Sequence, residues 1–162
     1  IGPTNEVAAR YFFEAGFDAL TVNPLAGWEG GLKPLFELAH GLGKGIIILA
    51  YMSHPGASET FGLRTLGPDG REIPLYKFFV RKAIDWGADG LVVGATRPEV
   101  IREVREVVGP DMALFSPGVG VQGGRAKDAL EAGADFIIVG RSITEAEDPA
   151  GAAEAILKSI SA

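Results

Sequence analysis

Cysteine is absent from the 162 residues of this sequence, which excludes disulfide bonds and thiolate metal sites. Histidine is almost as scarce. The sequence contains two, His40 and His54, which are too few for a histidine-rich metal site. The 15 basic side chains are outnumbered by 21 acidic ones, and a formal net charge of −6 is untypical of a non-specific nucleic-acid binder. No apolar run approaches the roughly 20 residues of a membrane helix. We therefore expect a cytoplasmic protein with no nucleic-acid and no membrane partner.

The sequence does contain enough apolar side chains for a core. Hydrophobic residues make up 47% of it, which fits a globular protein, and we expect residues 1–162 to form a single domain. The chain opens on Ile1, and its apolar pattern begins almost at once. From this opening we expect the chain to be a piece of a longer polypeptide.

Helical spacing of apolar residues alternates along the chain with short, continuously apolar runs. Residues 46–51 are the clearest strand, because a strand in a parallel sheet covered on both faces is apolar throughout. Residues 52–56 follow it, and after them a long polar stretch extends to about residue 73. The first helix carries one apolar face, made of Val7, Ala8, Tyr11, Phe12 and Ala15. The patterns predict helices at residues 2–16, 32–41, 74–86, 98–108, 126–132 and 149–160, and strands at residues 19–23, 46–51, 90–94, 112–115 and 136–139.

Three segments of the sequence resemble one another, at residues 15–22, 86–93 and 132–139. Each has the pattern of a helix end, a glycine, an aspartate and a buried strand. Glycine caps the helix and the short turn leads into the next parallel strand, so the repeat indicates successive strand–helix units. The aspartates of these turns are interpreted as turn-forming residues without a catalytic role: Asp18, Asp89 and Asp135.

Five predicted parallel strands are compatible with two architectures. An open, doubly wound sheet of this size would be complete with five strands. A (β/α)8 barrel would need three more strands and their helices, because such barrels usually take at least about 200 residues. The strand count favours the open sheet, whereas the residues at the strand ends favour the barrel.

Glycine-containing turns follow the last two predicted strands. Residues 116–125 read Ser-Pro-Gly-Val-Gly-Val-Gln-Gly-Gly-Arg, and residues 139–142 read Val-Gly-Arg-Ser. In (β/α)8 barrels, a phosphate commonly lies between the loops after the seventh and eighth strands, where backbone N–H groups hold it. Arg141 can form a two-pronged pair with phosphate oxygens, and Gln122 can donate an amide hydrogen. The two loops together predict a phosphate site, which a glycine-rich turn alone would indicate only weakly.

The clearest strand runs into residues 52–56, Met-Ser-His-Pro-Gly, at the end where α/β folds bind ligands. Ser53 is suited to hydrogen-bond a polar edge of a substrate. It is not expected to be a nucleophile, because no Gly-x-Ser-x-Gly elbow surrounds it and no partner base is evident. His54 is interpreted as a loop-fixing residue and His40 as a surface residue. Two further residues end predicted strands on the same side and are candidates for lining the site: Asn23 and Thr96.

Four segments together resemble the orotidine 5′-phosphate decarboxylase family, especially its short archaeal-type members. They are residues 52–56 (Met-Ser-His-Pro-Gly), 95–99 (Ala-Thr-Arg-Pro-Glu), 116–124 (Ser-Pro-Gly-Val-Gly-Val-Gln-Gly-Gly) and 138–143 (Ile-Val-Gly-Arg-Ser-Ile). Their order and spacing agree over essentially the whole chain. The resemblance implies an α/β fold, a (β/α)8 TIM barrel, of which this chain supplies about five strands and six helices.

The resemblance also implies an activity. Members of this family are lyases of pyrimidine biosynthesis that act as homodimers and decarboxylate orotidine 5′-monophosphate to UMP without a cofactor or metal. Ser53 would contact the pyrimidine ring, and residues 117–127 would close over the substrate with Gln122 touching its phosphate. Gly140 and Arg141 would complete the phosphate grip. Such remote phosphate binding is a way to drive loop closure and lower the barrier at the ring.

Two more residues are implied to act across a dimer, since Ile1 and Thr4 would reach into the neighbouring subunit's site. The full implied substrate-binding set is Ile1, Thr4, Ser53, Pro117, Gly118, Val119, Gln122, Gly123, Gly124, Gly140 and Arg141.

The sequence departs from the family in the segment that carries the chemistry. Family members have an Asp-x-Lys-x-x-Asp segment, whose lysine protonates the carbon that loses carbon dioxide and whose aspartates crowd the leaving carboxylate. This sequence contains no such segment, and residues 1–5 match the Ile-x-x-Thr-Asn that follows it in the family. We therefore expect a C-terminal portion that lacks the first three strands, contains no catalytic residue, is inactive alone and needs a companion N-terminal segment or chain.

Two other readings stay open. One is a different phosphate-binding barrel enzyme, such as a sugar-phosphate decarboxylase or aldolase, which shares the site at the last two strands. The other is a non-catalytic nucleotide-binding α/β module, which would explain the absence of a lysine–carboxylate cluster.

Overall fold

Five parallel strands form one sheet in the computed structural model, which describes residues 1–161. The sheet has the order β1-β2-β5-β6-β7, and every neighbouring pair is parallel. The strands are β1 (Ala19–Val22), β2 (Gly45–Tyr51), β5 (Gly90–Val93), β6 (Ala113–Pro117) and β7 (Phe136–Ile138). The α/β class and the five predicted strands are thereby confirmed.

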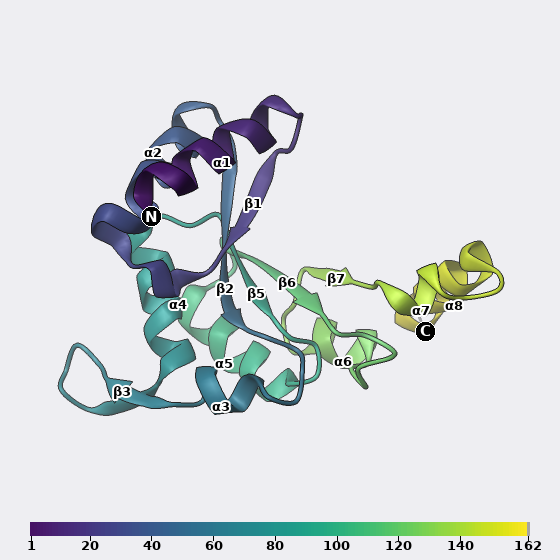
Figure 1. The fold of residues 1–162 in the computed structure, drawn as a ribbon. Helices are drawn as coiled ribbons and strands as arrows, with labels where there is room; N and C mark the ends of the chain where they lie inside the picture. The colour runs from purple at the N-terminus through teal and green to yellow at the C-terminus, as the bar shows by residue number, and fades with distance from the viewer. Residues whose placement is uncertain (162) are drawn as a thin grey trace.

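Helices connect these strands, as the crossover between parallel strands requires. The six predicted helices are all present, as α1 (Gly2–Glu14), α2 (Lys33–Gly41), α4 (Leu75–Trp86), α5 (Pro98–Val108), α6 (Ala126–Glu131) and α8 (Pro149–Ser161). Helices α1 and α2 lie at one end of the molecule and α7 and α8 at the other, beyond β7 (Figure 1). No helix among the described residues combines the length and apolar character needed to cross a bilayer.

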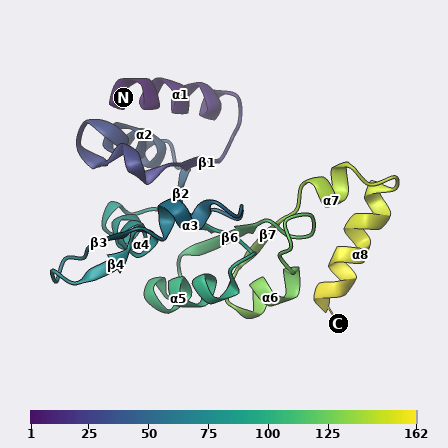
Figure 2. The same ribbon diagram turned by 60° about the horizontal axis from the view of Figure 1, so that its bottom comes forward.

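The predicted polar stretch and the last loop contain further elements that the pattern did not predict. They are α3 (Ala57–Phe61), a hairpin of β3 (Arg64–Leu66) and β4 (Glu72–Pro74), and α7 (Arg141–Thr144). The hairpin projects from the rest of the fold (Figures 1 and 2). Between β1 and α2 the chain makes tight turns at Pro24–Ala26 and Trp28–Leu32.

The core lies between the sheet and its helices. Alternate residues of β2 are fully buried, at Ile46, Ile48 and Ala50, whereas Ile47 and Leu49 on the other face are half-buried. This alternation follows from the period of two in a strand. The helices contribute the other side of this core through side chains that include Phe36, Phe79, Val80, Ile101 and Val104.

The repeated turn ties neighbouring strands together at their amino ends. Asp89 accepts a hydrogen bond from the Ile46 N–H at 2.7 Å, and Asp135 accepts one from the Leu114 N–H at 2.8 Å. Asp18 differs, because its carboxylate pairs with Lys44 Nζ at 2.6 Å and is 92% exposed. The glycine that precedes each turn has a positive φ, as expected for a helix cap: Gly16, Gly87 and Gly133.

Helix α1 packs through a different face from the one that its apolar pattern defines. Ala9 and Phe13 are buried, whereas Val7, Tyr11 and Phe12 are 69%, 71% and 42% exposed. The predicted apolar face therefore does not contribute to the core of this chain. It lines a wide hollow of about 710 Å³ on the surface, together with Pro3, Thr4 and Ala8.

Candidate functional site

Four loops meet beyond the carboxyl ends of β2, β5, β6 and β7. They are residues 52–56, 94–97, 118–125 and 139–142, and residues 141 and 142 begin the short helix α7. Because all five strands are parallel, these ends share one edge of the sheet, which is where α/β folds bind ligands.

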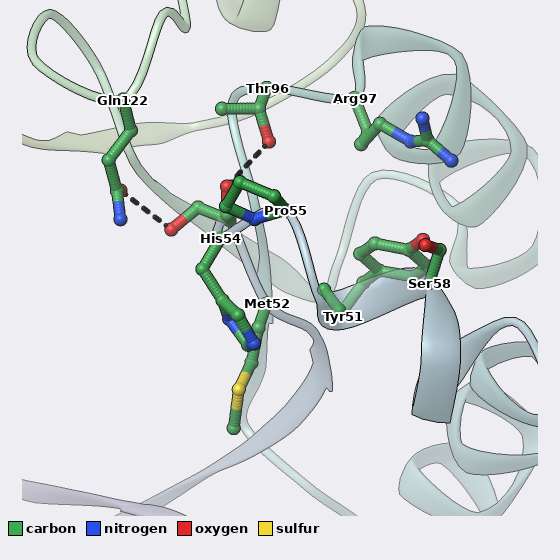
Figure 3. Close-up of a pocket in the computed structure, with 10 residues that line it drawn as sticks. Tyr51, Met52, His54, Pro55, Ser58, Thr96, Arg97 and Gln122 are labelled. Atoms are coloured by element: carbon green, nitrogen blue, oxygen red, sulfur yellow. Dashed lines mark hydrogen bonds between the residues drawn. The ribbon is translucent and has the colours of Figure 1, made fainter.

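The loop after β2 is joined to the loops after β5 and β6. Ser53 Oγ donates to Gln122 Oε1 at 2.8 Å, and Thr96 Oγ1 donates to the Ser53 carbonyl at 3.0 Å (Figure 3). These contacts border a cavity of about 190 Å³. The cavity is lined by Tyr51, Met52, Ser53, His54, Pro55, Ala57, Ser58, Thr96, Arg97 and Gln122. It presents hydroxyl, amide and imidazole groups, which suit the polar edge of a heterocycle.

The glycine-rich loop has a defined backbone. The Gly120 N–H donates to the Gly124 carbonyl at 2.9 Å, and the Gly124 N–H donates to the Gly118 carbonyl at 3.1 Å. Gly118 has a φ of +99°, and a Cβ built on it would lie 2.5 Å from Ser53 Cβ and 2.9 Å from Gln122 Oε1. Glycine is therefore required here both for the backbone conformation and for the approach of Ser53 and Gln122.

A second cavity, of about 270 Å³, lies between the glycine-rich loop and the loop after β7. Its lining consists of Pro117, Gly118, Val119, Val121, Gln122, Ile138, Gly140, Arg141 and Ser142. Gln122 lines both cavities, so the two are neighbours. Arg141 supplies the cationic group of this second cavity, and a guanidinium is the side chain best matched to phosphate oxygens.

The sequence profile of the orotidine 5′-phosphate decarboxylase / HUMPS family matches residues 1–156. The chain belongs to this family. Among the curated members, the orotidine 5′-phosphate decarboxylase of Methanosarcina barkeri is 42% identical over 159 residues, which are 98% of this chain and 66% of that protein. The Pyrococcus abyssi enzyme is 39% identical, over 97% of this chain and 67% of its own length. The chain thus spans about two thirds of the length of these relatives.

Solved structures of the decarboxylase family have the same fold. The Methanocaldococcus jannaschii orotidine 5′-monophosphate decarboxylase, in complex with the inhibitor BMP, matches with a TM-score of 0.84 at 28% identity. The Pyrococcus horikoshii enzyme matches with a TM-score of 0.79 at 36% identity. Each match covers 100% of this chain and 70% of the solved one. The five-stranded sheet is therefore the corresponding part of the (β/α)8 barrel of the family.

The structure brings most of the substrate-binding residues implied by the family resemblance to these two cavities. Ser53 and Gln122 meet in the first, and the second contains Pro117, Gly118, Val119, Gln122, Gly140 and Arg141. Gly123 and Gly124 form the turn that supports Gln122. Ile1 and Thr4 line neither cavity, and Ile1 is 78% exposed at the start of α1. The binding roles of all these residues stay predictions.

The other polar residues considered from the sequence lie in different surroundings. Thr96 and His54 line the first cavity. Asn23 instead accepts a hydrogen bond from the Leu25 N–H at 3.0 Å and so caps the turn after β1. His40 is a surface residue whose Nε2 lies 3.2 Å from an oxygen of Asp89.

Sequence reasoning did not single out Arg97, Ser58 or Ser142 as site residues. Arg97 lies over the Tyr51 ring at 5.9 Å and pairs with Glu99 at 3.1 Å. Arg97 was included in the Ala-Thr-Arg-Pro-Glu segment of the family resemblance, which was the available signal for it. Ser58 belongs to no motif of the sequence. It reaches the cavity because it lies on the short helix α3, which the polar pattern did not predict.

A cluster of polar side chains behind the first cavity joins α4 to α5. Tyr76 packs edge-on against Tyr51 and donates its hydroxyl to Glu103 at 2.5 Å, and Lys77 pairs with Glu103 at 2.7 Å. Burial, followed by the hydrogen bond to the Glu103 carboxylate, raises the pKa of Tyr76 well above its ordinary range. The hydrogen bonds from Lys77 and then Tyr76 lower the pKa of Glu103. Across residues 1–161, no group of three or more histidines and carboxylates gathers to hold a metal ion.

Proposed function

We propose that this chain supplies the pyrimidine- and phosphate-binding loops of an enzyme that decarboxylates orotidine 5′-monophosphate to UMP in pyrimidine biosynthesis. In this reaction the ring carbon loses carbon dioxide, keeps the bonding electron pair and takes up a proton. The observation that carries the proposal is the placement of Gln122. This residue lines a polar cavity with Ser53 and a second cavity with Arg141, so one ligand with a ring and a phosphate can contact both.

The proposed roles follow from the chemistry of each cavity. Ser53 hydrogen-bonds the pyrimidine edge, and Gln122 reaches from the glycine-rich loop to the phosphate. Arg141, with the Gly140 backbone, holds the phosphate oxygens. Contacts to the phosphate hold residues 117–127 closed over the ligand, and the energy of those contacts lowers the barrier at the ring.

Calorimetric titration of the chain with UMP and with uridine tests this assignment. Replacing Arg141 by alanine is expected to weaken UMP binding by about 10- to 100-fold, because a charge-assisted hydrogen bond is lost, and to leave uridine binding unchanged. Arg125→Ala is the matched control, since Arg125 belongs to the same loop region, is exposed and pairs with Asp128 outside the cavity lining. Equal losses in the two variants, or tighter binding of a pentulose phosphate than of UMP, would contradict the proposal.

We infer that decarboxylation itself needs a further segment, which corresponds to the third of the relatives that this chain does not match. Strands β1 and β7 are the two ends of the sheet, and each has one edge without a strand partner among residues 1–161. Three additional strands paired with those edges would close the barrel. On this proposal the chain alone turns over no substrate, and co-expression with a segment that carries Asp-x-Lys-x-x-Asp restores turnover. Turnover by the isolated chain would disprove the requirement.

We further propose that the complete barrel is a cytoplasmic homodimer that joins through the hollow on α1. The hollow is apolar, and Thr4 lies in it, where the family resemblance implies contact with the neighbouring subunit. Tyr11 is 71% exposed there, an unusual state for a large aromatic side chain unless a partner covers it. Tyr11→Arg is expected to halve the mass measured by sedimentation of the assembled protein. An unchanged mass would place the dimer contact elsewhere.

A further inference from the structure

The tip of the glycine-rich loop contacts the residue that follows Arg141. The Val121 N–H donates a hydrogen bond to Ser142 Oγ at 3.2 Å. The neighbouring Gly120 has a φ of +81°, and a Cβ built on it would overlap the Ser142 hydroxyl. Glycine at position 120 therefore suits both the positive φ and the lack of room for a Cβ beside Ser142. Such a residue allows the two loops to approach closely.

Val121 and Gln122 are attached to opposite sides of the site. Val121 is held by Ser142, which follows β7, and Gln122 is held by Ser53, which follows β2. Within the loop itself, the Gly123 N–H donates to the Gly120 carbonyl at 2.7 Å, so residues 120–123 form one tight turn. Because the two contacts lie on opposite sides of the turn, each one prevents the turn from rotating about the other.

The exposure of this turn decides what the Ser142 contact can contribute. Val121 is 59% exposed and Gln122 is also exposed, so water competes with Ser142 and Ser53 for these two contacts. Hydrogen bonds in such surroundings add little to the stability of the whole fold. Their effect is local, because they decide what fraction of time the turn spends against the second cavity.

We propose that Ser142 is a positioning residue that holds the tip of the loop, residues 120–123, against the cavity that contains Arg141. Because Ser142 is adjacent to Arg141 in the sequence, this contact ties the Gln122 turn to the backbone that carries Arg141. Ser142 acts through the Val121 backbone and not by touching the reacting atoms. The identity of the ligand rests on the proposed function, whereas the anchoring of the loop does not.

Amide hydrogen exchange, followed by NMR in the 162-residue chain, tests the anchor directly. Ser142→Ala is expected to speed exchange of the Val121 amide about fivefold, the effect of losing one net hydrogen bond, and to leave the Gly124 amide unchanged. Ser159→Ala, which removes an exposed hydroxyl on α8, is the matched control and leaves Val121 at its original rate. Acceleration below twofold at Val121 in Ser142→Ala would overturn the inference.

Binding measurements then test whether the Ser142 contact also positions the loop for the ligand. Ser142→Ala is expected to weaken UMP about fivefold and uridine not at all, and Ser142→Thr, which keeps the hydroxyl, to restore UMP binding. Faster exchange with unchanged UMP affinity would overturn the positioning role. Failure of the unsubstituted chain to bind UMP would contradict the proposed function alone, because the exchange rates at Val121 still decide whether Ser142 anchors the loop.

Discussion

The two ends of the same five strands are held together by different chemistry. At the amino ends, the carboxylates of Asp89 and Asp135 accept backbone N–H groups of neighbouring strands, and Asp135 also pairs with Arg105. At the carboxyl ends, the contacts join exposed groups of the loops, as between Ser53 and Gln122.

The difference separates stability from ligand geometry. A half-buried N–H left without its acceptor costs its full desolvation energy, so the amino ends contribute to the free energy of unfolding. Groups that water can reach contribute little to that free energy but set the positions of side chains around a ligand. Variants at the two ends should therefore affect different measurements. Three substitutions at the strand ends test this division, and a fourth, on the helix layer, gives a reference that belongs to neither end.

The largest expected effect is at an amino end. Asp135→Ala removes the acceptor of the Leu114 N–H and the partner of Arg105, and should lower the free energy of unfolding by about 1–3 kcal/mol in urea titrations. Asp18→Ala is the matched control, because Asp18 is at the equivalent repeat position but pairs only with Lys44 at the surface. Its effect should be far smaller. Weakened UMP binding in Asp135→Ala under conditions where it is fully folded would break the division.

The next effect is expected at a carboxyl end and in binding. Gly118→Ala places a Cβ 2.5 Å from Ser53 Cβ and should weaken UMP binding by about tenfold more than Gly123→Ala does. Gly123 has a comparable positive φ of +89°, but no atom lies within 4 Å of its built Cβ, so it reports the backbone strain without the collision. Equal losses in the two variants would show that strain alone matters.

A smaller effect is expected for the hydroxyl that joins the two cavities. Ser53→Ala removes the donor to Gln122 Oε1 and should weaken UMP binding about threefold to tenfold. Its urea midpoint should match that of the unsubstituted chain. A clear drop in the midpoint would mean that this contact stabilises the fold as the aspartate turns do.

The smallest effect concerns the helix layer behind the first cavity. The pKa of Glu103 is held below its ordinary value of 4.5, so its contribution to stability is present above that pH and is lost as the pH falls through the lowered value. Glu103→Gln should cost less than about 1 kcal/mol at pH 7, because the carboxylate is 46% exposed. The difference between the two proteins should shrink below about pH 4.5 in urea titrations. A difference that grows in acid would have the wrong sign.

The sequence predicted the strands and long helices because each is bounded by a local signal. The glycine–aspartate repeat marks the amino ends of three strands. The structure shows why: Gly87 has the positive φ that ends the preceding helix, and Asp89 accepts a hydrogen bond from the neighbouring strand. The two cavities were anticipated from the segments around Ser53 and Arg141, since parallel strands bring their carboxyl ends to one edge.

Other features depended on contacts that no local pattern contains. The apolar side chains of α1 indicated a face but not what covers it, and the helix packs instead through Ala9 and Phe13. The hairpin of β3 and β4 was hidden because its short strands are polar and partly exposed. Ser142 was passed over because its significance lies in a contact with Val121, 21 residues away.

The attachment of one turn to Ser53 and Ser142 has a mechanical consequence. In the sheet order, β5 and β6 lie between β2 and β7, so the two contacts of residues 121–122 connect segments that follow non-adjacent strands. A displacement of either segment therefore reaches the same turn. The turn thus relates the positions of two segments that share no strand pairing, and a variant that shifts one of them is expected to be felt at the other.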